Sequence, residues 1–256
     1  MVATENRTGT PELKGKRALV TGGTRGIGAG IVRRLLEAGA EVLTTARSSS
    51  GTVPDGARFV AADVRSQEGA RELAAAAGEV LGGVDILVHN AGGAQPHASA
   101  LGIPDEEWLD ALNLNLLASV RLDALLAPGM RERGSGAIVH VSTAAVPAAF
   151  PPFLHYTVAK AGLENYSRGL AAELAPAGVR VNTVTPGRVT TPGGERVREE
   201  WARLDPTQAG AESLVPLGRD GLPDDIARAV LFLVSDQASW VTGSNFVIDG
   251  GEFPRG

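Results

Sequence analysis

The chain has 256 residues, a formal net charge of −5 and no cysteine. The acidic balance gives no reason to expect a nucleic acid or an anionic membrane surface as partner, and the missing cysteines exclude disulfides, a thiolate nucleophile and a cysteine metal site. Apolar residues make up 43% and charged residues 21%, which is typical of a globular protein rather than a disordered or fibrous one. No segment is long and apolar enough for a signal peptide or a membrane span, so we expect a cytoplasmic protein with no membrane partner and no metal.

Short apolar segments alternate with longer helical patterns along the whole chain. Strands are expected at 16–21, 41–46, 58–63, 84–89, 136–142, 179–184 and 245–250. Apolar residues at three- and four-residue spacing predict helices within 26–39, 66–82, 105–130, 155–178 and 223–236. This alternation predicts one doubly wound α/β domain over 14–256, with a parallel sheet covered by helices on both faces. Residues 1–13 are expected to form a mobile polar tail, and 190–215 a partly helical lid over the substrate pocket.

The glycine-rich segment TGGTRGIG, residues 21–28, follows the first strand and opens the first helix. Backbone N–H groups at such a helix start, with glycines that allow close approach, form a site for a pyrophosphate. A tight turn without a ligand is the alternative, because the spacing is G-x-x-x-G-x-G rather than G-x-G-x-x-G. The position after the first strand favours the dinucleotide.

The end of the second strand indicates which dinucleotide is bound. A site for NAD has an acidic residue about 20 positions beyond the last glycine, to hold the ribose 2′-hydroxyl. Here Ala46 and Arg47 occupy that place, and Arg25 lies in the glycine segment. Each arginine alone reads as a surface charge, but together they favour the 2′-phosphate of NADP(H). Asp63 either accepts a hydrogen bond from the adenine amino group or caps the next helix.

Polar residues collect where the later strands end, which is where ligands bind in such sheets. Asn90 follows the fourth strand, and Ser142 and Thr143 end the fifth. Tyr156 and Lys160 are four residues apart and therefore share one helix face. An ammonium close to the phenol would lower its pKa and let it exchange a proton with a substrate oxygen. A surface pair without function is the alternative for this spacing taken alone.

Taken together, the motifs TGGTRGIG, HNAGG, LNLN, STAA…YTVAK, VRVNTVTPGRVTT and TGSNFVIDGG resemble the short-chain dehydrogenase/reductase family over residues 15–251. The resemblance implies a Rossmann-type sheet of seven strands, nicotinamide hydride transfer and a homotetramer, or else a homodimer. It assigns Tyr156 as the catalytic acid/base, Lys160 as its pKa partner and ribose ligand, and Asn115 as the holder of a relay water. The family's catalytic serine commonly lies thirteen residues before the tyrosine, which here is Thr143. Ser142 is the alternative if the loop shifts by one residue.

The same resemblance implies cofactor contacts along the glycine segment and the strand ends. These are Gly22, Thr24, Arg25, Gly26, Ile27, Gly28, Arg47, Asp63, Val64, Asn90, Ala91, Gly92, Tyr156, Lys160, Pro186, Gly187, Val189 and Thr191. His89 stands where the family usually has asparagine, and we expect it to hydrogen-bond backbone across the sheet. His155 is expected to make a surface or lid contact.

The function expected from these features is NADP-dependent interconversion of a carbonyl and a secondary alcohol. The apolar loop with Phe150 and Phe153 predicts a fairly hydrophobic small-molecule ketone as substrate. Two alternatives stay open: a cofactor-binding protein with little turnover, and an epimerase or dehydratase that uses the same site.

Overall fold

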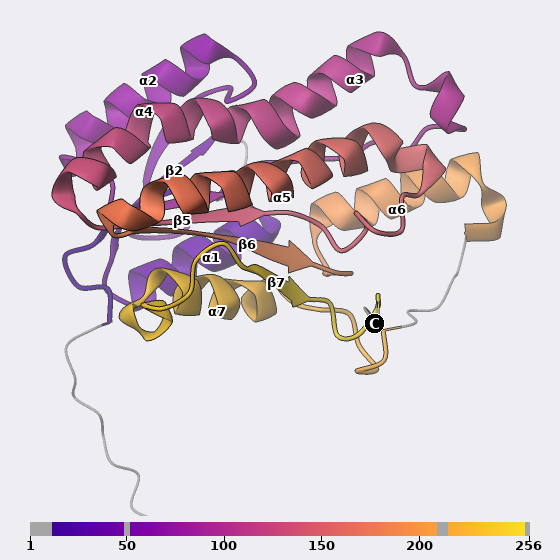
Figure 1. Cartoon of the computed structure of the whole chain (residues 1–256). Coiled ribbons are helices and arrows are strands. Elements are labelled where there is room, and N and C mark those ends of the chain that lie inside the picture. The colour runs from indigo at the N-terminus through magenta and orange to yellow at the C-terminus, as the bar shows by residue number, and fades with distance from the viewer. Residues whose placement is uncertain (1–11, 49–51, 209–214, 254–256) are drawn as a thin grey trace, which may run out of the picture.

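A computed structural model describes residues 12–48, 52–208 and 215–253, and its centre is a seven-stranded parallel sheet. The strands lie in the order β3-β2-β1-β4-β5-β6-β7 (Figure 1). Their bounds are β1 (Arg17–Thr21), β2 (Glu41–Ala46), β3 (Arg58–Ala61), β4 (Ile86–His89), β5 (Gly136–Val141), β6 (Val179–Pro186) and β7 (Asn245–Ile248). The order reverses between β1 and β4, which creates the switch point where doubly wound sheets bind their ligands.

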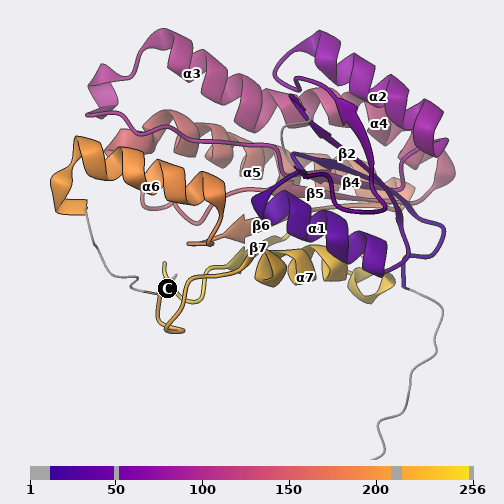
Figure 2. The ribbon, with the colours of Figure 1, turned by 180° about the vertical axis from the view of Figure 1, so that it is seen from behind.

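Helices cover both faces of the sheet, as the strand–helix alternation predicts. They are α1 (Gly26–Glu37), α2 (Gln67–Leu81), α3 (Asp105–Leu112), α4 (Ala118–Arg133), α5 (Leu154–Leu174), α6 (Pro192–Leu204) and α7 (Pro223–Val234). Helices α2, α4 and α5 lie on one face and α1 and α7 on the other, while α6 lies beyond the end of β6 (Figures 1 and 2). The Rossmann-type α/β fold is confirmed.

Each central strand is apolar on both sides because both of its faces are covered. In β1, Ala18 and Val20 point into the core beneath α1 and α7, whereas Leu19 points into the core beneath α2 and α4. The alternation repeats in β4, where Val88 joins the first core and Leu87 the second. This two-sided burial explains the nearly continuous apolar runs in the sequence.

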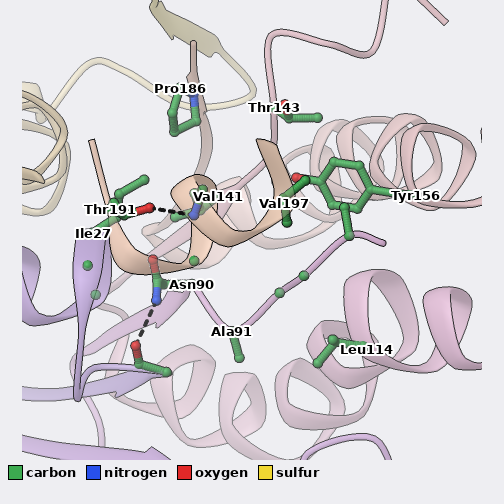
Figure 3. Close-up of a pocket in the computed structure, with 18 of the residues that line it drawn as sticks. Ile27, Asn90, Ala91, Leu114, Val141, Thr143, Tyr156, Pro186, Thr191 and Val197 are labelled. Atoms are coloured by element: carbon green, nitrogen blue, oxygen red, sulfur yellow. Dashed lines mark hydrogen bonds between the residues drawn. The ribbon is translucent and has the colours of Figure 1, made fainter. Parts of the chain in front are cut away.

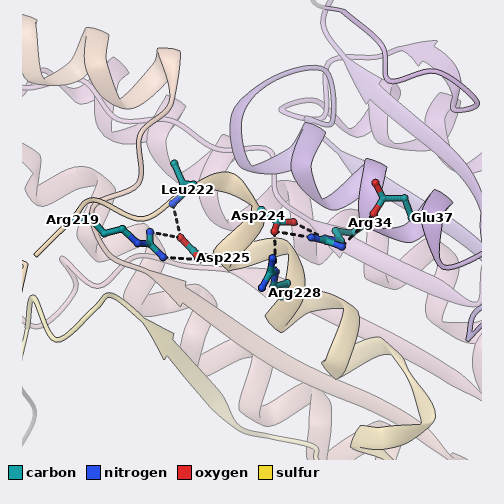
Figure 4. Close-up of polar contacts among 7 residues, drawn as sticks. All are labelled: Arg34, Glu37, Arg219, Leu222, Asp224, Asp225 and Arg228. Carbon is teal, nitrogen blue, oxygen red and sulfur yellow. Dashed lines mark hydrogen bonds and ion pairs between the residues drawn. The ribbon is translucent and has the colours of Figure 1, made fainter. Parts of the chain in front are cut away.

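Helix α7 is fixed against α1 by charged side chains at its start (Figure 4). Asp225 accepts a hydrogen bond from the Leu222 backbone N–H at 2.7 Å, which satisfies a donor ahead of the first turn. Asp224 accepts hydrogen bonds from Nε and Nη2 of Arg34 on α1, at 2.5 and 2.7 Å. These contacts help to hold α1 in place, and the glycine segment leads into α1.

Two boundaries differ from, or refine, the expectation. Leu13 was predicted to belong to the tail, but it is 1% exposed and packs in the core beneath α1, so the folded domain includes it. Residues 1–11 of the predicted tail lie outside the described residues. The segment predicted as a lid contains α6 followed by a short turn at Pro206–Gln208, and its part at 209–214 lies outside the described residues.

Candidate active site

A cavity of about 750 Å³ opens at the carboxyl ends of β1, β4, β5 and β6 (Figure 3). Every residue predicted to contact the cofactor lines it, as do Ser142, Thr143, Phe150 and Phe153. Asn115 is 1% exposed and lies behind this lining. The sequence therefore identified the walls of one continuous cavity from segments far apart in the chain.

The glycine segment forms a cradle that side chains would fill. Gly22 has a φ of +70°, which favours glycine, and a Cβ on Gly28 would lie 2.2 Å from the Gly22 carbonyl oxygen. The Asn90 amide donates to the Thr21 and Gly22 carbonyls at 3.0 and 3.1 Å and so ties the segment to the end of β4. The first turn of α1 has no acidic residue and no side-chain cap. These features fit a dinucleotide pyrophosphate against the N-terminus of α1.

Two arginines also line the cavity, Arg25 within the glycine segment and Arg47 just after β2. Arg25 and Arg47 are exposed, and neither guanidinium forms an ion pair or hydrogen bond with another described residue. Asp63 accepts a hydrogen bond from the Arg65 backbone N–H at 3.1 Å. Ser66, not Asp63, caps α2, since the Ser66 hydroxyl accepts from the Gly69 N–H at 3.0 Å. The capping alternative for Asp63 is therefore wrong.

The two adjacent hydroxyls at the end of β5 have different partners. The Ser142 hydroxyl is buried and donates to Oε1 of Glu164 at 2.7 Å. The half-buried Thr143 hydroxyl accepts from the Ala145 backbone N–H at 3.3 Å and lies close enough to the Tyr156 phenol to favour its ionised form. Thr143 and Tyr156 lie on the same side of the cavity (Figure 3). This arrangement brings Thr143, and not Ser142, to the phenol.

The acidity of Tyr156 differs in direction from the sequence-based expectation. Burial raises the pKa of Tyr156 to about 12, and the nearby Thr143 side chain opposes this shift. We expected Lys160 to lower that pKa, but in the structure the loss of hydration outweighs other influences. The phenol is consequently protonated at neutral pH and placed to donate.

Lys160, one helical turn after Tyr156 on α5, has a defined hydrogen bond. Its ammonium donates to the Val141 carbonyl at 2.7 Å, and the side chain is 3% exposed. Burial lowers the pKa of Lys160 to about 8, and the Glu164 carboxylate one helical turn along α5 opposes this shift. Glu164 thus links the Ser142 hydroxyl and the charge of Lys160, a role that sequence reasoning missed.

Asn115 occupies a π-helical turn, Asn113–Leu117, between α3 and α4. Its amide accepts from the Gly93 N–H and donates to the carbonyls of Gly93 and Ala111, each at 3.1 Å. A Cβ on Gly92 would lie 3.0 Å from the Asn115 Oδ1 and 3.4 Å from the Lys160 Nζ. The turn therefore directs Asn115 to the loop that passes next to the lysine.

A buried polar cluster lies under the ends of β4 and β5. Asp123 of α4 accepts from Nε2 of His89 at 2.7 Å and from Nε2 of His140 at 3.0 Å. Burial and the nearby Asp123 carboxylate together raise the pKa of Tyr166. His89 is structural as expected, but its partner is this carboxylate and not backbone. His140 also contacts the Ser167 hydroxyl at 3.1 Å through Nδ1.

The same cluster has the residue types of a metal site, yet its geometry favours hydrogen bonding. The His89 and His140 rings are stacked, with centroids 4.8 Å apart and planes 8° from parallel. An ion bound by two imidazoles must lie near both ring planes, and stacked parallel planes do not meet. Burial lowers the pKa of His140, so a neutral ring donating to an ionised Asp123 is the favoured state.

Aromatic side chains close the substrate end of the cavity. Phe150 and Phe153, predicted from the loop, contact Trp201 of α6 with ring centroids at 5.9 and 5.3 Å. Phe253, near the C-terminus, contacts Phe150 at 6.4 Å. His155 is not at the surface as expected: it is 3% exposed and packs edge-on against His97 at 5.0 Å.

A glycine cradle at the switch point and a Tyr–Lys pair beside a strand-end hydroxyl define a nicotinamide-dependent oxidoreductase site. Comparison with known proteins agrees. A family model described as enoyl-(acyl carrier protein) reductase matches residues 22–252. The 3-oxoacyl-(acyl-carrier-protein) reductase FabG of Vibrio cholerae is 36% identical over 247 residues, covering 94% of this chain and 98% of the relative.

Solved structures lead to the same group. A short-chain dehydrogenase/reductase family protein is 40% identical with a TM-score of 0.83, over 93% of this chain and 97% of that one. Levodione reductase is 27% identical with a TM-score of 0.87, over 94% and 98%. The chain belongs to the short-chain dehydrogenase/reductase family. It is an oxidoreductase of carbonyl and alcohol groups that binds a nicotinamide cofactor. Among its described residues, no helix combines the length and apolarity needed to cross a bilayer.

Proposed function

We propose that the chain is an NADPH-dependent ketoreductase that acts on a fairly hydrophobic small-molecule ketone. The observation that carries this proposal is the placement of Thr143 beside Tyr156 inside the cavity (Figure 3), with the buried Lys160 ammonium one helical turn further along α5. When bound, the cofactor would supply a hydride to the carbonyl carbon of the substrate. The protein must then hold the carbonyl oxygen and protonate it.

In the proposed mechanism Thr143 and Tyr156 both donate hydrogen bonds to the substrate oxygen. The raised pKa of Tyr156 keeps the phenol protonated at neutral pH, which suits a proton donor in the reductive direction. Charge that develops on the oxygen draws the phenolic proton across. Lys160 binds the cofactor ribose and its positive charge stabilises the phenolate left behind. Asn115 positions the Gly93 loop beside Lys160 and serves the relay that restores the proton.

The preference for NADP(H) rests on Arg25 and Arg47. Both are unpaired among the described residues, both line the cavity, and no acidic residue follows β2 to repel a 2′-phosphate. Two guanidiniums that line the same cavity suit a dianionic phosphate. The remaining contacts predicted from sequence, from Gly22 to Thr191, belong to the same proposal.

Assembly and location stay predictions. Leu109 on α3, Leu117 in the π-helical turn and Leu125 on α4 are 53%, 37% and 43% exposed, and Val158 on α5 is 45% exposed. Apolar side chains gathered on adjacent helices support the predicted homotetramer or homodimer. Light scattering of the purified protein measures this directly. The expected site of action is the cytoplasm.

The test of the proposed function is the absorbance of NADPH with a panel of ketones, for the wild type and Tyr156→Phe. Loss of the proton donor should cut turnover by about 10²–10⁴ while NADPH binding is retained. Tyr166→Phe is the matched control, because these are the two tyrosines of the chain and Tyr166 contacts Asp123 outside the cavity. That variant should lose stability but keep turnover.

Three results would contradict the proposal. If Tyr156→Phe turned over at the wild-type rate, Tyr156 would not be the proton donor. Tight NADPH binding without oxidation by any ketone would favour a binding protein. Product formation without a change in absorbance would favour an epimerase or dehydratase.

A further inference from the structure

Four aromatic side chains from distant parts of the chain form what we call the aromatic box: Phe150, Phe153, Trp201 and Phe253. Three ring pairs connect them, with centroids 5.3 to 6.4 Å apart. The planes meet at 90° for Phe153 and Trp201, 63° for Phe150 and Phe253, and 56° for Phe150 and Trp201. All four residues line the cavity that contains Thr143 and Tyr156.

The ring orientations favour a flat cyclic ligand over a flexible chain. Aromatic rings attract each other in edge-to-face or offset arrangements at centroid distances of about 4.5–7 Å. Because the walls of the box face different directions, a further ring placed among them can meet both edges and faces. A linear chain would have to freeze several torsions to fill the same space, and each carries an entropic cost.

The size of the cavity supports the same choice. Its volume of about 750 Å³ includes the glycine cradle and the space beside Arg25 and Arg47 as well as the box. A dinucleotide in the first two parts leaves a compact volume for the substrate. Val197, one turn before Trp201 on α6, adds an apolar contact from the same helix.

We propose that the aromatic box selects carbonyl compounds in which an aromatic or alicyclic ring carries the carbonyl group next to it. The ring lies among the four side chains, and the oxygen reaches the Thr143 and Tyr156 hydroxyls. The inference rests on the proposed function for the chemistry, but the binding preference stands on the box alone.

The test uses three methyl ketones of equal carbon number: acetophenone, cyclohexyl methyl ketone and 2-octanone. The linear ketone has the most flexible chain and more apolar hydrogens than acetophenone, so hydrophobic burial alone favours 2-octanone. The double variant Trp108→Phe/Trp240→Phe leaves Trp201 as the one tryptophan of the chain. Its fluorescence, titrated with each ketone in the presence of NADP⁺, reports binding without turnover.

We expect acetophenone to change Trp201 fluorescence and to bind about 2- to 12-fold more tightly than 2-octanone, the range of one aromatic pair. Cyclohexyl methyl ketone gains only the smaller loss of torsional freedom, so its affinity should lie between the two. Trp201→Leu retains an apolar side chain but removes the ring. For that variant the two ketones are compared by the rates at which they oxidise NADPH when both compete for the enzyme. The ratio of the acetophenone rate to the 2-octanone rate should fall by a similar factor. Phe232→Leu is the control, because Phe232 pairs with Phe246 at 6.2 Å and does not line the cavity.

Equal binding of 2-octanone and acetophenone overturns the inference. An equal loss of affinity for both ketones in Trp201→Leu also overturns it, because the box would then cover the substrate without distinguishing ring from chain. Ring ketones that bind at Trp201 without any oxidation of NADPH would instead contradict the proposed function and leave the box intact.

Discussion

Acidification should destabilise the fold through His140, and His140→Gln should remove that effect. His140 is fully buried, and burial lowers its pKa despite the opposing Asp123 carboxylate. The unfolded chain has a histidine pKa near 6.5. Below that pH the histidine therefore binds a proton in the unfolded state but stays neutral in the folded state. The stabilising contribution is complete above about pH 6.5 and is lost as the pH falls towards the folded pKa.

The magnitude follows from proton linkage. One titrating histidine changes the free energy of unfolding by up to about 1.4 kcal/mol per pH unit. Burial also lowers the pKa of His155, so the wild-type slope contains both groups. The difference between wild type and variant isolates His140. Glutamine is the suitable replacement, because its amide N–H₂ reaches about as far as the histidine Nε2 and can still donate to Asp123.

Urea unfolding followed by circular dichroism at pH 7.5, 6.5, 5.5 and 5.0 measures this slope. We expect His140→Gln to be less stable at pH 7.5, because the stack with His89 is lost, and yet less sensitive to acid. Parallel stability curves for the two proteins would refute the reasoning, since they would mean that His140 takes up no proton on unfolding.

Three further predictions concern the cavity. Glu164→Gln removes a charge that raises the pKa of Lys160, so the loss of NADPH affinity at high pH should begin at a lower pH, measured by fluorescence titration. Thr143→Val should reduce turnover by about 10²–10³, as for loss of an oxyanion donor, while Ser142→Ala should change it far less; the opposite ranking with the same ketone would assign the serine. Arg47→Asp should weaken NADPH binding relative to NADH, and equal dissociation constants for both cofactors in the wild type would exclude the proposed preference.

The sequence predicts the fold and the cavity walls well, because both depend on local signals. Strand ends, glycines and strand order determine which backbone positions meet at the switch point, and all predicted wall residues from Gly22 to Thr191 are found there. The family resemblance, through its spacing of thirteen residues before Tyr156, points to Thr143, and this residue lies on the same side of the cavity as the phenol (Figure 3).

Contacts between side chains that are distant in sequence were not predictable in the same way. In the sequence Asp123 is one polar residue in a long predicted helix. It becomes the partner of two histidines only because α4 packs on β4 and β5. Trp201 and Phe253 carry no periodic signal, so their meeting with Phe150 depends on where α6 and the C-terminal segment fold back. The direction of the Tyr156 pKa was missed because burial is a property of the whole fold.

The π-helical turn at Asn113–Leu117 has a consequence for how this protein tolerates insertions and deletions. Such a turn contains one residue more than a regular turn, and removing one residue would restore ordinary helical bonding. Each residue also rotates a helix by about 100°, so the same deletion would swing Asn115 away from Gly93 and Ala111. A shortened chain would gain a more regular helix and lose the loop anchor beside Lys160. The length of this stretch is therefore constrained together with the identity of Asn115, unlike the length of a surface loop, which tolerates insertions and deletions.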